Sequence, residues 1–151
     1  MDSLRVDSGI KTIEVNDAGE CISIPISDAA FYERFGDLVK NFDGKQAEIE
    51  QRAKDLSEKH KDKPDNDADA IIDSIQLYSE LCRYTCEEID KLFGEGCCRK
   101  VFVGVQNPSV ELIGDFFDKI TPLLNQYAQE RNQKINLMYS RNRKGGRSKD
   151  V

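Results

Sequence analysis

The fold is decided by a short apolar stretch that joins two amphipathic segments, Leu92-Phe93-Gly94-Glu95-Gly96-Cys97-Cys98-Arg99-Lys100-Val101-Phe102. Gly94 can adopt the left-handed conformation that ends a helix, and Gly96 supplies a second flexible joint. The rest of the stretch predicts one short turn of helix. After it, Asn107 can cap the next helix and Pro108 can occupy the first position of that helix. A solvated loop would not need so many large apolar side chains. We therefore predict two helices joined by a compact apolar connector.

Apolar side chains at helical spacing predict three long helices, over residues 28–59, 67–93 and 108–138. We expect the first helix to continue past Gly44, although a glycine weakens a helix interior. The second helix carries the most regular stripe, with spacings of three and four: Ile71, Ile75, Tyr78, Cys82, Cys86, Ile89 and Phe93. Its regularity predicts an amphipathic helix whose apolar face is this stripe.

A β-hairpin is predicted over residues 10–26, because two β-rich runs flank the turn sequence 16–20. A lone hairpin is marginally stable in water, so it must pack on the helices or on another subunit. The fold class is therefore mainly α, with an N-terminal hairpin and a single domain over residues 10–139. Residues 1–9 are expected to be flexible, and residues 140–151 are expected to form a disordered tail.

The charge is divided unevenly along the 151 residues. The formal net charge is −6, but residues 131–151 hold seven Lys and Arg against one acid, a net charge of +6 that leaves −12 on residues 1–130. An acidic body with a basic end is typical of proteins that work through interactions. No apolar run approaches the roughly 20 residues that span a bilayer, and the N-terminus lacks an apolar signal core, so we expect a cytoplasmic protein without membrane contact.

The five cysteines fit a reducing compartment better than a disulfide framework, because their number is odd and two are adjacent. Cys82, Cys86, Cys97 and Cys98 do not have the spacing of a zinc site, so small apolar packing residues are the favoured interpretation. The positive charges that follow Cys97 and Cys98 could lower a thiol pKa. Burial would raise it, and a neutral thiol is the favoured alternative.

No pattern in the chain indicates catalysis. There is no nucleophile elbow, Walker sequence or dinucleotide fingerprint, and the single histidine, His60, is expected to be an ordinary surface residue. We therefore expect a protein that is not an enzyme and has no catalytic residue, cofactor or metal site.

The basic end offers an alternative function. Its cations could neutralise nucleic-acid phosphates, and they are Arg141, Arg143, Lys144, Arg147 and Lys149. Basic composition alone gives no base readout, so we rank nucleic acid below a protein partner. The same residues could instead act as a solubilising end, or meet the acidic body of a second copy. The alternative interpretation is thus a small helical nucleic-acid-binding or regulatory adaptor.

The order of elements and the motifs of residues 92–102 and 108–117 resemble the tail assembly chaperones of siphophages and prophages. In those proteins a connector of the form LFG…G…KVFG precedes a helix that begins at proline. The stretch from Tyr127 to Arg131 and the ending from Tyr139 to Lys144 are also similar. The likeness covers roughly residues 10–145. Residues 103–106 are less acidic than the corresponding stretch of the family, and Gly44 interrupts the first helix.

The resemblance implies a non-catalytic protein that binds and solubilises the tape measure protein during tail morphogenesis. It also implies that the tail-tube protein later replaces the chaperone, that copies oligomerise through the hairpin and helices, and that the site of action is the cytoplasm of the bacterial host. Such chaperones are absent from the mature virion.

Five apolar residues near the connector are the candidates for partner binding: Phe93, Phe102, Val105, Phe116 and Phe117. Our hypothesis is that they line a groove that accepts a helix of the partner. The alternative is that all five belong to the internal core, which is the commoner position of phenylalanine.

Overall fold

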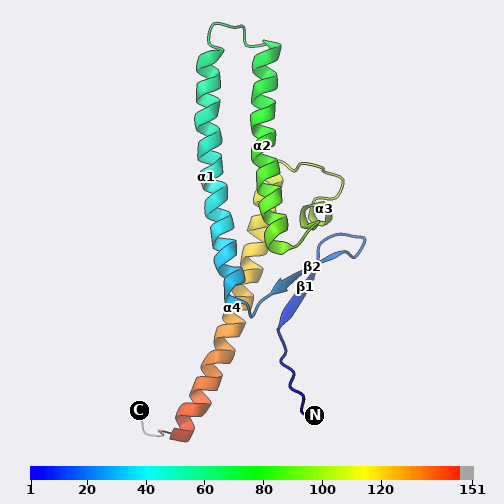
Figure 1. The fold of residues 1–151 in the computed structure, drawn as a ribbon, viewed down its shortest axis with the longest axis vertical. Coiled ribbons are helices and arrows are strands. Elements are labelled where there is room, and N and C mark those ends of the chain that lie inside the picture. Colours follow the sequence, from blue (N-terminus) through cyan, green and yellow to red (C-terminus); the bar gives the residue numbers. More distant parts are fainter. Residues whose placement is uncertain (147–151) are drawn as a thin grey trace.

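The structure is a computed structural model that describes the backbone of residues 1–146 and the side chains of residues 1–132. Its elements are the strands β1 (Ile10–Glu14) and β2 (Cys21–Pro25) and the helices α1 (Ala29–Lys59), α2 (Ala68–Phe93), α3 (Cys97–Val101) and α4 (Val110–Gly146). Figure 1 shows α1 and α2 as an antiparallel pair that projects well beyond the other elements, with α4 crossing behind its lower part. The predicted mainly helical fold with an N-terminal hairpin is confirmed.

The two helices of the projecting pair begin and end within one residue of the predicted positions. Asp28 caps α1, since its carboxylate accepts a hydrogen bond from the Ala30 N–H, and Asp67 caps α2 by accepting from the Ala70 N–H. Gly44 does not interrupt α1. Local capping signals therefore located both helices correctly.

The start of α4 differs from the prediction. The helix begins at Val110, and the hydroxyl of Ser109 accepts a hydrogen bond from the Leu112 N–H at 3.3 Å. Asn107 does not cap the helix, because its amide donates to the carbonyl oxygen of Ser79 on α2 at 3.1 Å. A contact between segments distant in sequence has thus replaced the expected cap.

The end of α4 also lies further along the chain than predicted, at Gly146 rather than residue 138. The basic tail expected over residues 140–151 therefore begins on this helix, and residues 147–151 lie outside the described part of the chain.

The main core lies where the hairpin, the first turns of α1, the end of α2, α3 and α4 meet. We call this region the base. Its buried residues are Ile22, Ile24, Ile26, Phe31, Leu38, Ile89, Phe93, Cys97, Cys98, Phe102, Ile113, Phe116, Ile120 and Leu124. Five different segments of the chain contribute to it, so the base is the part of the fold that fixes their relative positions.

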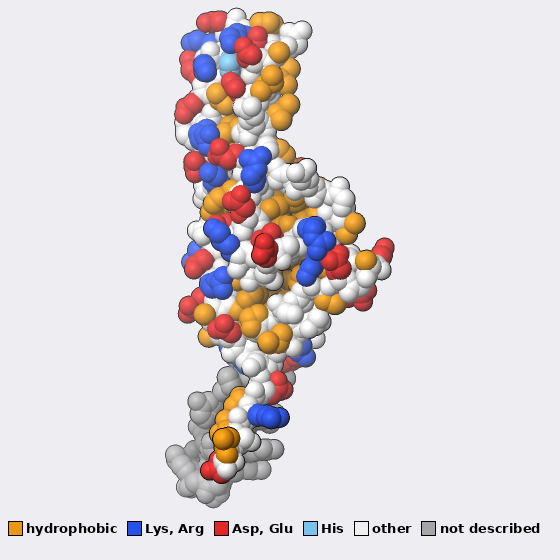
Figure 2. All heavy atoms as spheres, turned by 45° about the vertical axis from the view of Figure 1, so that its right-hand side comes forward, with side chains coloured by type: hydrophobic (Ala, Val, Ile, Leu, Met, Phe, Trp, Pro, Cys, Tyr) orange, Lys and Arg blue, Asp and Glu red, His pale blue; other side chains and the backbone are white. Residues whose placement is uncertain are grey.

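The apolar stripe predicted on α2 is buried only in its C-terminal half. In the projecting half, Ile71, Ile75 and Tyr78 are exposed, and Ile75 keeps 62% of its surface. The side chains of α2 that face α1 there are instead Leu77 and Leu81, which pack with Ile49 in a second, smaller core. Figure 2 shows hydrophobic side chains along one edge of the projecting part. None of the described helices is long and apolar enough to cross a bilayer.

Candidate protein-binding groove

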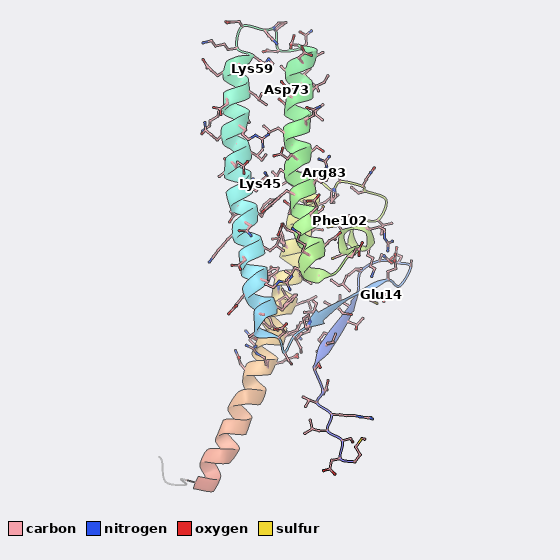
Figure 3. The ribbon with its side chains drawn as sticks, in the orientation of Figure 1. Glu14, Lys45, Lys59, Asp73, Arg83 and Phe102 are labelled. Atoms are coloured by element: carbon pink, nitrogen blue, oxygen red, sulfur yellow. The ribbon has the colours of Figure 1, made fainter. Side chains whose placement is uncertain are left out.

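A groove of about 460 Å³ opens between the β-hairpin, the segment that follows α3, and α4. Its floor contains Phe102 and Phe116, which are buried and meet edge to face with ring centroids 6.0 Å apart. Its rim is apolar and exposed: Val103 keeps 66% of its surface, Leu112 keeps 39% and Val105 keeps 38%. Figure 3 labels Phe102 beside α3 and Glu14 at the end of β1, the two elements that face each other across the groove.

Polar contacts attach the hairpin to α3 and so hold the two walls in place. The amide of Asn16 donates to the carbonyl oxygen of Lys100 at 3.0 Å, and the Lys100 ammonium donates to the carbonyl oxygen of Cys21 at 3.1 Å. Arg99 forms an ion pair with Glu20 at 3.0 Å. Hydrogen bonds from Arg99 and Asn16 hold the pKa of Glu20 below its usual value. These contacts add to the burial of Ile22 and Ile24 in the base, and together they fix the position of the two-stranded hairpin.

Glycines and one carboxylate shape the connector. Gly94 and Gly96 have φ of 112° and 83°, conformations that side chains rarely adopt, so the chain can turn sharply between α2 and α3. The carboxylate of Asp90 accepts a hydrogen bond from the Cys98 N–H at 2.9 Å, which satisfies a donor in the first turn of α3. A second turn follows α3, where the Val105 N–H donates to the Phe102 carbonyl oxygen at 3.0 Å. This turn places two valines on the rim.

The structure brings three of the five candidate binding residues to the groove, namely Phe102, Val105 and Phe116. Phe93 and Phe117 do not line it. The Phe93 ring lies behind Phe116, with centroids 5.5 Å apart, and the Phe117 ring faces α1. Phe93 is buried in the core and Phe117 is partly buried against it, because both rings point toward α1 and not toward the hairpin. Phe102 and Phe116 also belong to the core, so the core interpretation is wrong only for Val105, which is exposed.

The prediction missed the contribution of the hairpin and the wider face of α4. The additional apolar lining residues are Ile13, Val15, Ile22, Val101, Val103, Leu112, Ile120 and Leu123. Ile13 on β1 and Val15 directly after it are two positions apart in extended chain and therefore share a face, which is a signal that the sequence contained. The sequence near β1 does not indicate which helix this face of the hairpin meets. That depends on contacts between the hairpin turn and α3, such as the one between Asn16 and Lys100.

The charged residues that line the groove are Glu14, Asp115 and Lys119. Asp115 and Lys119 form an ion pair with each other at 2.9 Å, as expected for residues four positions apart on a helix. The lining therefore combines a broad apolar surface with a few charges, which suits recognition of an apolar polypeptide segment.

The cysteines behind the groove are poor nucleophiles. Burial raises the pKa of Cys97 to about 12. The pKa of Cys98 is also raised, chiefly by its contact with Cys86 and by burial. The positive charges of α3 thus fail to outweigh desolvation. All five cysteines are free thiols.

His60 is not the surface residue that the sequence predicted. Its side chain is only 8% exposed, and its Nε2 lies 2.9 Å from a carboxylate oxygen of Asp73 across the projecting helices. The loop between α1 and α2 folds the ring against α2, an outcome that a charged linker sequence does not reveal.

No group of three His, Cys, Asp or Glu side chains close enough to hold a metal ion occurs among the residues whose side chains are described. The basic residues Arg141, Arg143, Lys144, Arg147 and Lys149 lie beyond that part of the chain. Their proposed role therefore stays a prediction.

Comparison with known proteins identifies a family but not an activity. Residues 18–150 match the model of a family of unknown function, DUF6673. The chain belongs to this family. No curated protein and no solved structure matches the chain. The DUF6673 region runs from the hairpin turn to residue 150, so it contains every wall of the groove except β1 and the adjoining Val15.

Proposed function

We propose that this DUF6673 protein is a phage tail assembly chaperone that binds an apolar helical segment of the tape measure protein in the groove and keeps that protein soluble. The observation that carries the proposal is the exposed apolar rim, Val103, Val105 and Leu112, around a floor of buried aromatic rings. Exposed apolar surface gathered around a cavity is typical of sites that bind another polypeptide.

The arrangement suits a helix docked by one apolar face. Helical partners present anchors three or four residues apart, and such anchors bind in grooves lined by apolar side chains. The rim side chains can contact the partner while the floor supplies rings that do not rearrange. The Phe116 ring of the floor meets the Phe93 ring edge to face, and Phe93 in turn meets Phe31 in the same way. The floor is therefore part of the packed core, and the groove is formed before any partner arrives.

The proposed partner comes from the resemblance of residues 92–102 and 108–117 to siphophage and prophage tail assembly chaperones. A groove of this size contacts a limited part of a helix, so many copies would be needed along a long chain and each could be displaced. This is the behaviour required of a chaperone that acts in the host cytoplasm and leaves before the virion is complete. Catalysis has no part in the proposal.

The test is co-expression with the tape measure protein and measurement of the partner's soluble fraction. We choose Val103→Asp and Leu112→Asp because both side chains are exposed, so the charge should not disturb folding. Val39→Asp is the matched control, since Val39 is 37% exposed on α1 and does not line the groove. Phe102→Asp is less informative because Phe102 is buried.

The expected result is a soluble partner with the unaltered chain and with Val39→Asp, and an aggregated partner with the two groove variants. Circular dichroism and thermal melts should show that all variants fold. Equal protection by Leu112→Asp and the unaltered chain would exclude the groove as the binding site. Salt-dependent DNA binding that disappears when residues 140–151 are removed would favour the adaptor function instead.

A further inference from the structure

The segment before the hairpin carries apolar side chains with nothing packed on them. Residues 1–9, which we call the arm, form no helix or strand in the structure. Leu4 and Val6 keep 86% and 79% of their surface. Figure 1 shows the arm running away from the hairpin and from the other elements. The molecule therefore has both an open apolar groove and an unpartnered apolar segment.

The arm has the pattern of a strand with one apolar side. In an extended chain successive side chains point to opposite sides, so Leu4 and Val6 project together while Arg5 and Asp7 project the other way. The arm can thus insert two apolar side chains into a groove and keep its charges at the rim.

One wall of the groove offers an open strand edge. The sheet has only two strands, and the Val15 N–H donates to the Glu20 carbonyl oxygen, which identifies 15 and 20 as a hydrogen-bonded pair. Bonded and non-bonded pairs alternate along an antiparallel ladder, so Thr12 and Glu14 direct their backbone groups away from β2. An extended segment lying in the groove along β1 would satisfy these groups.

The charges of the arm and the rim are complementary. Glu14 lines the groove next to this strand edge. Within the part of the chain whose side chains are described, neither Glu14 nor Arg5 belongs to an ion pair, whereas Asp115 and Lys119 on the opposite wall pair with each other. Arg5 therefore complements Glu14, the one carboxylate of the described groove lining that belongs to no ion pair.

We infer that the arm of a second copy of this chain occupies the groove along β1, with Leu4 and Val6 on the apolar lining and Arg5 beside Glu14. The arm of the same copy is poorly placed for this role, because it leaves the far end of β1 at Gly9 and continues away from the groove. Each copy has one arm and one groove, and the inferred assembly is a two-fold dimer in which the copies exchange arms and both grooves are filled.

This inference does not depend on which partner the groove serves. It does imply that the arm and the partner exclude each other, so the groove would be covered between copies until a partner displaces the arm. Removing the arm should leave partner binding intact or make it tighter. A loss of dimerisation would therefore test the arm, and a loss of partner solubility would test the proposed function, so the two proposals can fail separately.

The first experiment measures the mass of the chain in solution by sedimentation velocity over a range of concentrations. The full chain should dimerise, and a chain that lacks residues 1–8 should be a monomer. Leu4→Asp should weaken the dimer at least about tenfold. Ser3→Asp adds the same charge on the opposite side of the arm and is the matched control, which should dimerise almost normally.

A charge exchange tests the pairing itself. Arg5→Glu and Glu14→Arg should each weaken the dimer, because each places like charges together, and the double variant should recover most of the affinity. A labelled peptide of residues 1–10 should bind the arm-deleted chain and fail to bind when that chain also carries Leu112→Asp.

Three outcomes would overturn the inference. The full chain could be a monomer at every concentration, or the arm-deleted chain could dimerise as well as the full chain. In the latter case Ile75→Asp would show whether the exposed face of α2 is the interface. Equal weakening by Arg5→Glu alone and by the double variant would exclude the assigned pairing.

Discussion

The base and the projecting end of the α1–α2 pair are built in different ways. We call the latter, residues 45–80, the tip. The base buries fourteen hydrophobic side chains from five segments, whereas the small core beside the tip buries Ile49, Leu77 and Leu81. This difference in core size shows that the α1–α2 pair is part of a large hydrophobic core at one end and has few buried side chains at the other.

Polar contacts compensate in part for the small core of the tip. Glu80 pairs with both Arg52 and Lys45, and His60 pairs with Asp73. The ion pairs of Glu80 are partly exposed and contribute little to stability, because solvent screens them. We therefore expect the tip to open locally at a lower free energy than the base, as regions with few buried contacts do.

The strongest test of this comparison is Ile113→Ala in the base. Ile113 is fully buried on α4, and replacing a buried isoleucine by alanine costs about 2–5 kcal/mol of unfolding free energy. Urea denaturation followed by circular dichroism measures the loss. A loss well under 1 kcal/mol would mean that the base is not the main core.

Leu77→Ala is the matched change in the tip. We expect a smaller loss of roughly 1–2 kcal/mol, because a lightly packed site can collapse around the cavity. Hydrogen exchange should accelerate in residues 45–80 and stay unchanged in the base. Faster exchange in β1, β2 and α3 would instead show that the two regions unfold as one unit.

The buried thiols of the base give a test that depends on pH. Because the pKa of Cys97 is raised to about 12, the folded state keeps this thiol neutral at a pH where the unfolded chain ionises it. Its contribution to stability is complete below about pH 8.5 and is lost as pH rises toward 12. Cys97→Ala should therefore flatten the alkaline loss of stability in urea titrations. In the unaltered chain at neutral pH, iodoacetamide should label the partly exposed Cys21 long before the buried Cys97.

A small effect is expected from Glu80→Gln in the tip. Hydrogen bonds from Arg52 and Lys45 lower the pKa of Glu80, so this carboxylate stabilises the fold above its unfolded pKa. That stabilisation disappears as pH falls through the lower folded value. Thermal melts should show a small difference between the variant and the unaltered chain at pH 7 and a smaller one near pH 3. A constant difference would mean that the Glu80 charge is not responsible.

The sequence was sufficient wherever the signals were local. Asp28 and Asp67 begin their helices as capping residues do, and Gly94 ends α2 as predicted. The sequence predicted part of the groove, namely Phe102, Val105 and Phe116. It did so because the connector carries large apolar side chains that a solvated loop would not need.

The remaining features depend on contacts that no local pattern reveals. Asn107 looked like a helix cap, but the fold uses it to reach Ser79. Ile71 and Ile75 looked like core residues because their spacing is helical, yet no third element packs on that face. The hairpin wall of the groove was missed for the same reason, since its position depends on the contact between Asn16 and Lys100.

The attachment of the hairpin to α3 has a consequence for synthesis of the chain. Asn16 and Glu20 contact residues 84 and 79 positions later in the sequence. A ribosome adds roughly 5–20 residues per second, so the newly made hairpin waits on the order of ten seconds before its docking site exists. During that interval the apolar face of the hairpin can contact other nascent chains. Neighbouring ribosomes on the same messenger RNA carry identical chains, so these contacts would form between copies of this protein.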